Sequence, residues 1–495
     1  VWQPENCIQC NRCAYVCPHA VIRPIALTEE EAANAPEGMD MIDMIGMPNM
    51  KFSIAVSAYD CTGCGSCANV CPGKKGEKAL VMGNMEANAG RQTFFDYGTE
   101  LPIKPEVVAK FKETTVKGSQ FKQPLLEFSG ACAGCGETPY AKLITQLFGD
   151  RMYIANATGC SSIWGNSSPS TPYTVNPQGR GPAWSNSLFE DNAEFGYGML
   201  LAQNTIRERL KASVEKLVEN GANDDVKAAA QEYLDTFSVG ATNGTATDKL
   251  VKALEDCDCG CAERAELLKN KDFLAKKSQW IFGGDGWAYD IGFGGVDHVL
   301  ASGQDINIMV FDTEVYSNTG GQSSKATKTG ATAQFAAGGK ETKKKDLAGI
   351  AMSYGYVYVA QIAMGADFNQ TVKAIAEAEA YPGPSLIIAY APCINHGIKK
   401  GMSKAQTEEQ LAVECGYWNN FRFNPEAEKK FTLDSKEPKG DYQEFLNGEV
   451  RYNALMRANP EKAQRLFAQN EAEAMERYEY LKGLVNLYDG TAKED

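Results

Sequence analysis

Eight cysteines near the start of the chain form two runs with one spacing, Cys-x2-Cys-x2-Cys-x3-Cys-Pro. The first run starts at Cys7 and the second at Cys61. Three closely spaced thiolates hold three corners of an iron–sulfur cubane, and the fourth thiolate of each run reaches the cluster of the other run. The spacing therefore predicts two [4Fe–4S] clusters. Their ligands are Cys7, Cys10, Cys13 and Cys71 for one cluster, and Cys17, Cys61, Cys64 and Cys67 for the other.

Zinc is the alternative for these two runs, because Cys-x2-Cys hooks also bind zinc. A zinc ion needs only four ligands, so the duplicated three-plus-one spacing has no role in a zinc site. The exchange of the fourth ligand would instead join both runs into one compact unit. We therefore predict two clusters that lie close enough to exchange electrons.

A second set of cysteines is spread along the chain and falls at the ends of predicted elements: Cys132, Cys135, Cys160 and Cys393. A single Cys-x2-Cys pair is weak evidence, because redox dithiols and buried free thiols share that spacing. The pattern alone leaves a third cluster, a dithiol and unliganded thiols open. The other cysteines are interpreted as thiols without a metal; they are Cys257, Cys259, Cys261 and Cys415.

Residues with carboxylate or hydroxyl side chains stand at the ends of two apolar runs. Gly284-Asp285-Gly286 follows one run, and Asp312-Thr313-Glu314-Val315 follows the other, with Asn318 after it. A Mg²⁺ ion that holds a diphosphate takes one or two protein oxygens near a turn, which Asp285, Thr313 and the Val315 carbonyl can supply. Glycines let the backbone approach phosphate, and a helix N-terminus favours its charge. An ordinary Asp-Gly turn is the alternative.

Short apolar runs alternate with helical patterns over the rest of the chain. The runs are 151–157, 279–286, 306–313, 356–362 and 384–391. Continuous apolar strands separated by helices are typical of a parallel sheet covered on both faces. We therefore predict a doubly wound α/β domain, which binds ligands beyond the carboxyl ends of its strands. Helices are predicted at 204–221, 371–383 and 460–488.

Composition divides the chain into four segments. Residues 1–100 are predicted to be an α+β, ferredoxin-like domain for two clusters, with a Met- and acid-rich insert near 24–52. Residues 101–128 have proline near both ends and are predicted to be a linker across the surface. Residues 129–430 are predicted to form the doubly wound domain, and 431–495 a C-terminal helical arm.

Bulk composition excludes several classes of protein. The net charge of −14 argues against a nucleic-acid partner, which needs clustered Lys and Arg. The sequence has no apolar run of about 18 residues, so no membrane span is expected. Sixteen cysteines without a secretion signal indicate metal ligands in a reducing, cytoplasmic compartment. The chain starts at Val1, close to its first cysteine, so we expect it to be part of a longer chain.

The order of these motifs resembles the pyruvate:ferredoxin (flavodoxin) oxidoreductase family. The similar segments are GACAGCGETPYAKL (130–143), the ATGCSS segment (157–196), DTEVYSNTGGQSSKAT (312–327) and LDSKEPKGDYQEFLNGEVRY (433–452). The segment from Gly284 resembles the thiamin diphosphate motif, in which Asn usually stands where this chain has Thr313. The resemblance covers essentially all 495 residues, in order.

The resemblance implies three [4Fe–4S] clusters, thiamin diphosphate and Mg²⁺. The second set of cysteines would bind the third cluster beside the thiamin. Asp285, Thr313 and the Val315 carbonyl would hold Mg²⁺, and Asn318 would face the substrate as a catalytic residue. The residues implied to bind the cofactor are Glu137, Cys160, Gly284, Asp285, Gly286, Trp287, Thr313, Glu314, Val315, Tyr316, Ser317 and Asn318.

The resemblance also implies a reaction. Pyruvate and coenzyme A would give acetyl-CoA and CO2, and the clusters would pass electrons to ferredoxin or flavodoxin. This chain would be the C-terminal part of the single-chain enzyme, with most of the pyruvate and coenzyme A sites in a missing N-terminal part. A homodimer in the cytoplasm of an anaerobic or microaerobic cell is expected, with no nucleic acid and no membrane as partner.

Two alternative functions stay open. A related 2-oxoacid:ferredoxin oxidoreductase would act on 2-oxoglutarate, a branched oxoacid or indolepyruvate. A non-enzymatic iron–sulfur electron carrier would bind no thiamin, and Asp285 and Thr313 argue against it. His298 and His396 are interpreted as structural. The run Lys340 to Lys345 (KETKKK) is interpreted as a solvated face, with a docking patch for an acidic ferredoxin as the alternative.

Iron and acid-labile sulfide content tests the number of clusters. Protein prepared without oxygen is expected to hold about twelve iron and twelve sulfide atoms per chain, four of each per [4Fe–4S] cluster. A content of about eight would restrict the clusters to the two N-terminal runs and remove the third one.

Overall fold

The computed structural model describes residues 1–166, 170–220 and 223–488. An eight-stranded sheet forms its centre, in the order β13-β12-β10-β11-β7-β6-β4-β5. The six strands from β10 to β5 are parallel, whereas β12 and β13 are antiparallel. The strands are β4 (Met152–Ala157), β5 (Ala183–Ser187), β6 (Ser278–Gly284), β7 (Asn307–Asp312), β10 (Tyr358–Ile362), β11 (Ser385–Tyr390), β12 (Phe421–Phe423) and β13 (Phe431–Leu433).

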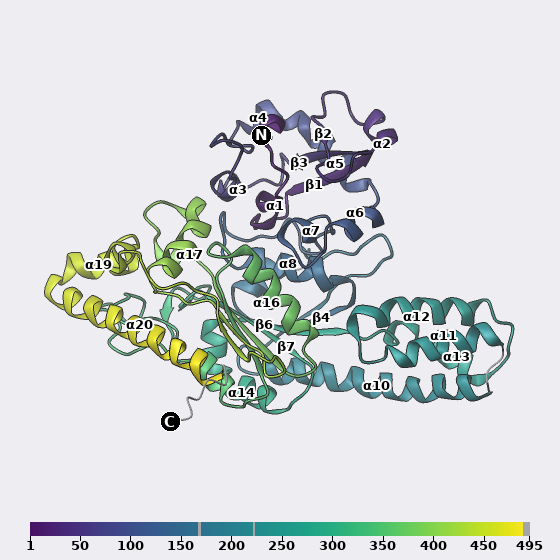
Figure 1. The fold of residues 1–495 in the computed structure, drawn as a ribbon. Helices are drawn as coiled ribbons and strands as arrows, with labels where there is room; N and C mark the ends of the chain where they lie inside the picture. Colours follow the sequence, from purple (N-terminus) through teal and green to yellow (C-terminus); the bar gives the residue numbers. More distant parts are fainter. Residues whose placement is uncertain (167–169, 221–222, 489–495) are drawn as a thin grey trace.

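Helices cover both faces of this sheet (Figure 1). Alternate residues of a strand point to opposite faces, so Ile154 packs under one layer and Ala155 under the other. One layer contains α8 (Thr138–Phe148) and α16 (Phe368–Ala380). The other contains α10 (Asn192–Asn220), α14 (Phe293–Ala301) and α15 (Leu347–Met352). The predicted doubly wound fold is confirmed, and each of the five predicted runs overlaps a strand.

A helical unit projects from the sheet and was not separated by the sequence analysis (Figure 1). The first part of α10 packs on the sheet, and the rest packs with α11 (Asp224–Asp235), α12 (Gly240–Glu255) and α13 (Ala262–Lys269). These helices share a hydrophobic core of their own, which includes Leu210, Tyr233 and Leu250. The predicted helix 204–221 lies within α10, except that residue 221 is outside the described residues.

The N-terminal domain is built on a three-stranded antiparallel sheet, β1-β3-β2. Its elements are β1 (Ile22–Thr28), α2 (Glu29–Ala33), β2 (Ile42–Asp43), β3 (Met50–Val56), α4 (Met85–Asn88) and α5 (Gln92–Glu100), with α1 (Arg12–Tyr15) and α3 (Ser66–Val70) within the two cysteine runs. The ends of the expected insert pair with each other, because Thr28 lies opposite Met50. A capping box between Thr28 and Glu31 then starts α2.

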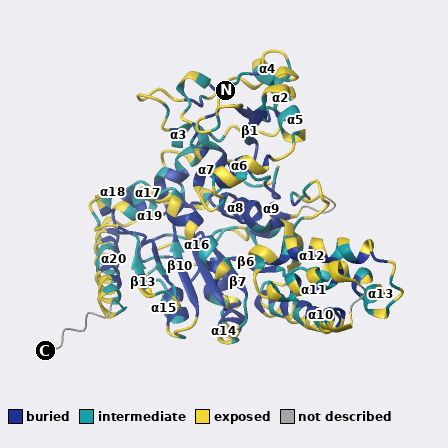
Figure 2. Ribbon diagram, turned by 45° about the vertical axis from the view of Figure 1, so that its right-hand side comes forward, coloured by how far each residue is buried: buried dark blue, intermediate teal, exposed yellow. Residues whose placement is uncertain are grey.

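The segment predicted as a linker is packed against both domains. It contains α6 (Pro105–Lys110) and α7 (Val116–Ser119), and it buries Leu125 and Leu126. The Lys142 ammonium on α8 donates to the Gln120 side chain of this segment and to the Ala14 and Tyr15 carbonyls at the end of α1. These contacts attach the N-terminal domain to the large one, and α6, α7 and α8 lie between the two in Figure 2.

The C-terminal helices complete the core on the α10 side of the sheet. They are α17 (Ala405–Glu414), α18 (Tyr442–Asn447), α19 (Val450–Ala458) and α20 (Pro460–Tyr488). The predicted helix 460–488 coincides with α20, and residues 489–495 of the predicted arm lie outside the described residues. Within the described residues, no helix is both long enough and apolar enough to cross a membrane.

Phe467 tests how strongly α20 is attached. Its side chain is 1% exposed and packs edge-on against Tyr452 with ring centroids 5.7 Å apart. Phe467→Ala is expected to lower the free energy of unfolding by about 3–5 kcal/mol, because the truncation leaves a cavity. Denaturant unfolding measures this change. The same truncation at Phe335, which is 94% exposed, is the control and should change stability by less than about 0.5 kcal/mol.

Candidate functional site

A cavity lies where three parallel strands end and the chain order reverses. From β4 the chain runs outward to β5 and then returns to β6 on the other side of β4. Such a reversal opens a crevice beyond the strand ends. The lining residues are Glu137, Thr158, Gly159, Cys160, Ser161, Phe189, Gly284, Asp285, Gly286, Trp287, Thr313, Val315, Tyr316, Ser317, Asn318 and Thr319.

This cavity brings together almost every residue that was predicted to bind the cofactor. They come from the loop before α8, the start of α9 (Cys160–Gly165), the end of β6 and the turn between β7 and β8 (Val315–Tyr316). Gly286 has to be glycine here, because an added Cβ would lie 2.5 Å from the Tyr316 ring. The exception is Glu314, whose side chain is fully buried away from the cavity.

Three oxygens converge at the floor of the cavity. The Thr313 hydroxyl lies 3.0 Å from Asp285 Oδ1 and 3.0 Å from the Val315 carbonyl oxygen. The Ser317 hydroxyl lies 2.5 Å from that of Thr313 and donates to the Val315 carbonyl at 3.4 Å, so two hydroxyl protons face the lone pairs of four oxygens. An octahedral Mg²⁺ shell with bonds of about 2.0–2.1 Å separates adjacent oxygens by roughly 3 Å. These oxygens therefore fit a magnesium ion.

Burial raises the pKa of Asp285, and the neighbouring Asp312 carboxylate raises it further. Its Oδ1 accepts from the Thr313 amide at 3.2 Å, and its Oδ2 accepts from the Ser324 hydroxyl at 2.6 Å. These bonds fix the carboxylate in place while its charge is poorly solvated. A divalent cation would supply the missing charge.

The turn that presents these oxygens is held in an unusual conformation. Glu314 has φ +60°, in the left-handed region that non-glycine residues rarely adopt. Its amide donates to Asp312 Oδ1 at 3.1 Å, and its carbonyl accepts from the Thr327 hydroxyl. The turn carries the Val315 carbonyl back toward Thr313, so the backbone shape and the oxygen cluster depend on each other.

Two cations, Lys344 and Arg451, stabilise this turn on the side away from the cavity. Lys344 pairs with Asp312 at 2.7 Å and with Glu314 at 3.0 Å, and Arg451 pairs with Glu314 at 2.9 Å. Arg451 also pairs with Glu449 at 2.6 Å, and the Tyr417 hydroxyl donates to Glu314 at 2.5 Å. Burial alone would raise the pKa of Glu314, but Lys344 and Arg451 hold it well below its usual range.

The second set of cysteines is also brought together, beside the cavity. Cys135 and Cys393 each lie close enough to Cys160 to raise its pKa, although burial and Glu137 raise it more. Cys132 likewise raises the pKa of Cys393. His396 is fully buried, and its Nε2 lies 2.7 Å from the Thr313 carbonyl oxygen. Neutral thiols at these positions need a cation to ionise them, which a bound cluster supplies.

The two N-terminal cysteine runs lie close together in the structure. A small cavity is lined by Cys7, Cys10, Cys13 and Cys71, and so by three cysteines of one run and the last cysteine of the other. The reciprocal set also converges, because Cys17, Cys64 and Cys61 raise the pKa of Cys67, which burial brings to about 12. The exchange of fourth ligands is thus compatible with the fold.

Within the described ranges, no three His, Cys, Asp or Glu side chains converge closely enough to hold a single metal ion. A [4Fe–4S] cluster spaces its thiolates around a cubane, and the proposed magnesium ligands include a hydroxyl and a carbonyl. The other cysteines stand apart from these sets: Cys257 and Cys415 are buried, and Cys259 and Cys261 lie 2.7 Å apart, sulfur to sulfur, beyond the end of α12.

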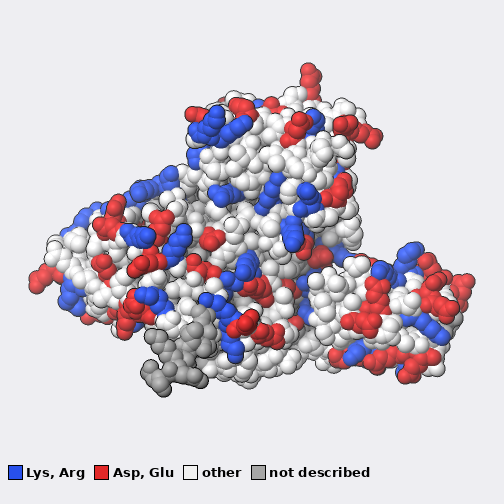
Figure 3. Space-filling view, viewed as in Figure 1, with Lys and Arg blue, Asp and Glu red and all other residues white. Residues whose placement is uncertain are grey.

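The interpretation of the lysine run as a solvated face is wrong for three of its lysines. Lys344 is in the buried ion network. Lys340 donates to the Ser324 and Thr327 carbonyls, and Lys345 donates to the Tyr289 carbonyl. Lys343 alone of the four is exposed, and it pairs with Glu476. Charge clustering in the sequence could not show this, because the carboxylates that neutralise Lys344 are about 30 residues away. On the face seen in Figure 3, basic and acidic side chains are interspersed.

Several residues that shape the site were not predicted. Ser324 holds Asp285, and Phe189 packs on Tyr316 with ring centroids 5.8 Å apart. Both lie within the similar segments quoted above, which was the only available signal for them. Residues 167–169 of the segment 157–196 lie outside the described residues.

Comparisons with known proteins match both parts of the chain. The thiamine pyrophosphate enzyme, C-terminal TPP binding domain family matches residues 265–389. The 4Fe-4S dicluster domain family matches residues 6–75. The chain is 56% identical over 98% of its length to a pyruvate-flavodoxin oxidoreductase of Enterobacter agglomerans, and it covers 42% of that protein.

Two other relatives show the same pattern. A pyruvate:ferredoxin oxidoreductase of Moorella thermoacetica is 57% identical over 98% of the chain, which covers 42% of that protein. A mitochondrial pyruvate dehydrogenase [NADP(+)] of Euglena gracilis is 48% identical over 94% of the chain, which covers 26% of that protein. The chain thus spans about two fifths of the length of the first two relatives and about a quarter of the third.

Arg451→Met tests the buried ion network. Removing the cation leaves Glu314 and Glu449 less neutralised, so the free energy of unfolding should fall by about 3–5 kcal/mol. Because the folded pKa of Glu314 is lowered, its stabilising contribution is present above the unfolded pKa of about 4.5 and is lost as pH falls below it. The variant should therefore lose less stability on acidification than the parent.

Arg457→Met is the matched control, since Arg457 is exposed on the same helix α19. Denaturant unfolding at several pH values measures both variants. Equal stability of the two variants would contradict the stabilising role given to Arg451.

Proposed function

Because this chain is 56% and 57% identical to a pyruvate-flavodoxin and a pyruvate:ferredoxin oxidoreductase and spans 42% of each, we propose that it belongs to their family and is the thiamin diphosphate and electron-transfer part of such an enzyme. The whole enzyme would convert pyruvate and coenzyme A to acetyl-CoA and CO2. The electrons would go to ferredoxin or flavodoxin. The two regions that match family models correspond to a TPP binding domain and a 4Fe-4S dicluster domain. These are the two kinds of cofactor that this reaction needs.

One observation carries the proposal: Cys160 belongs to two sites at once. It lines the cavity that Asp285 and Thr313 floor, and it lies within electrostatic reach of the other three cysteines of its set. A cluster bound there would be in contact with a cofactor in the cavity. That adjacency suits an enzyme whose cofactor gives up electrons one at a time, and it has no use in a simple electron carrier.

The chain's own residues would hold the cofactor by its diphosphate. Asp285, Thr313 and the Val315 carbonyl would hold Mg²⁺, which would offset the negative charge of the diphosphate. Glu137 and Asn318 line the same cavity, and the Glu137 carboxylate accepts from Trp164 Nε1 at 2.6 Å. Burial raises the pKa of Glu137 to about 7. When bound, thiamin diphosphate supplies the electron sink for loss of CO2.

Two contacts between the N-terminal domain and the segment of Cys132 and Cys135 support electron transfer between the cysteine sets. His19, two residues after Cys17, places its Nε2 2.9 Å from the Ala131 carbonyl oxygen, next to Cys132. Asn69 on α3 donates to the Ser403 carbonyl at 2.8 Å, and the preceding Met402 packs against Gly134. Residues next to Cys17 and Cys67 therefore contact residues next to Cys132 and Cys135.

The remaining proposals concern the whole enzyme. Most of the pyruvate and coenzyme A sites would lie in the part of the enzyme beyond this chain. The enzyme would act as a homodimer in the cytoplasm of an anaerobic or microaerobic cell. Replacing pyruvate by 2-oxoglutarate, a branched oxoacid or indolepyruvate in the assay distinguishes the proposed reaction from those of related enzymes.

Cys393→Ala in the full-length enzyme tests the role of the third cysteine set. Pyruvate-dependent reduction of ferredoxin should fall at least about 100-fold, in line with the loss caused by disturbing a metal site. Iron should fall from about twelve to about eight atoms per chain. Cys261→Ala is the control, because it removes a thiol outside all three sets. Undiminished electron transfer in Cys393→Ala would overturn the role.

A further inference from the structure

Three cysteines that the proposed reaction does not use lie at the outer end of the projecting helical unit. Cys257, Cys259 and Cys261 belong to the connection between α12 and α13, which has no regular secondary structure. Figure 2 shows α13 at the end of the unit that points away from the sheet. These thiols are therefore separate from the three cysteine sets assigned above to clusters, and a molecule that reacts with them has to come from solution.

Two of the three sulfurs are in contact. Cys259 Sγ lies 2.7 Å from Cys261 Sγ. A disulfide bond joins sulfurs about 2.05 Å apart, so a small rotation of the two side chains brings them to bonding distance. Both cysteines are partly exposed, and the space beside Gly260 is open, because an added Cβ would have no atom within 4 Å. A small reagent can therefore reach the pair.

The third cysteine has a different place. Cys257 is 4% exposed and packs in the core of the helical unit with Leu254 and Leu267. Its sulfur accepts from the Cys259 amide at 3.4 Å. Cys257 therefore anchors the connection to the core and fixes the backbone of Cys259, and the two sulfurs that can bond are those of Cys259 and Cys261.

A bond between Cys259 and Cys261 is not needed to hold the fold. Arg264 of α13 donates to the Leu254 carbonyl near the end of α12 at 2.6 Å, so the two helices are already joined there. The stabilisation that a disulfide gives grows with the loop that it closes, and this bond would span only Gly260. Exposed disulfides that contribute little to stability are the ones that small thiols reduce. The pair is therefore suited to reversible oxidation.

We propose that Cys259 and Cys261 form a reversible redox pair that exchanges with small organic disulfides. The thiolate of one cysteine attacks a sulfur of the disulfide, which forms a mixed disulfide and releases one small thiol. The thiolate of the other cysteine attacks the protein sulfur of the mixed disulfide and releases the second small thiol. The two cysteines lose two electrons and two protons, which reduce the small disulfide to two thiols. Neither cysteine lines the cofactor cavity, so this chemistry is independent of the proposed function.

Peptide mapping of the full-length protein, prepared without oxygen, tests the pair. The protein is equilibrated with oxidised and reduced glutathione at several ratios, free thiols are blocked with N-ethylmaleimide, and trypsin is added. Cleavage after Lys252 and Arg264 releases residues 253–264, which contain all three cysteines of the connection. This peptide should carry three blocked thiols when reduced glutathione is in excess and one when oxidised glutathione is in excess. Dithiothreitol should restore all three.

Two results of this mapping would overturn the proposal. One is a peptide that keeps three free thiols at every ratio, and the other is a peptide that accumulates glutathione adducts instead of an internal bond. Cys415, which is buried in the core of the large domain, is the internal control and should stay a free thiol throughout.

Variants identify the bonded cysteines. Cys259→Ser and Cys261→Ser should each stop at the mixed disulfide with glutathione, because the thiol that resolves it is missing. Cys257→Ala is the matched control and should still form the internal bond. Loss of the bond in Cys257→Ala, or its persistence in either serine variant, would show that other cysteines are joined and would contradict the assignment of the pair.

Discussion

Two buried cations, Lys344 and Arg451, allow a strand to end in acidic residues deep inside the protein. Without them, Asp312 and Glu314 would carry uncompensated charge in an apolar core, at a cost of several kcal/mol. With them, Glu314 can stay in a left-handed conformation that turns the Val315 carbonyl toward Thr313. The position of the oxygen cluster in the cavity therefore depends on the ion pairs of Lys344 and Arg451 on the other side of the turn.

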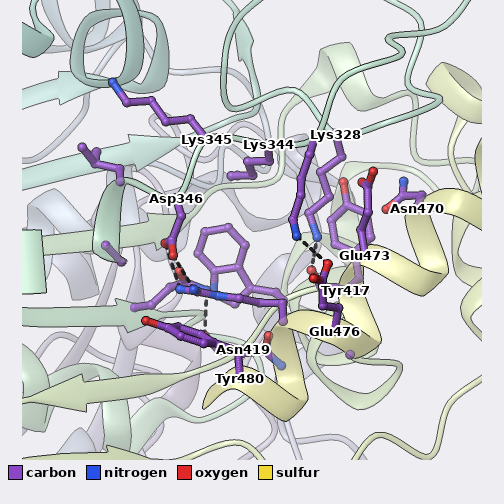
Figure 4. A pocket seen from close by; sticks show the side chains of 18 of the residues that line it. Lys328, Lys344, Lys345, Asp346, Tyr417, Asn419, Asn470, Glu473, Glu476 and Tyr480 are labelled. Atoms are coloured by element: carbon purple, nitrogen blue, oxygen red, sulfur yellow. Dashed lines mark hydrogen bonds and ion pairs between the residues drawn. The ribbon is translucent and has the colours of Figure 1, made fainter. Parts of the chain in front are cut away.

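That dependence extends to the end of the chain. Arg451 and Glu449 lie at the start of α19, and Tyr417 follows α17, so three of the groups that hold the turn come from the segment after the last parallel strand. The helices described as an arm therefore contribute to the site. They also close a cavity of about 310 Å³ next to Lys328 and Lys344 (Figure 4), which places two pockets on opposite sides of one turn.

The sequence predicted what local pattern encodes. β4, β6, β7, β10 and β11 are continuous apolar runs because helices bury both of their faces, and α20 was placed exactly. β5 was missed because AWSNS is a polar edge strand, and β12 and β13 because three residues carry no period. The burial of Lys344 depends on partners brought in by the fold, so the lysine run was misread. Cysteine spacing indicated the two N-terminal sets. Cys160 and Cys393 were grouped by their places at the ends of predicted elements, and only the resemblance assigned a cluster to their set, because their meeting point depends on the sheet topology.

One continuous helix, α10, joins the projecting helical unit to the sheet. Helix α10 has 29 residues without interruption and at 1.5 Å per residue spans about 43 Å. At its base, the fully buried Asn192 donates to the Ala155 and Phe282 carbonyls of β4 and β6. Because one continuous helix runs from the tip of the unit to the sheet, the placement of the unit is coupled to the two strands whose ends open the cavity.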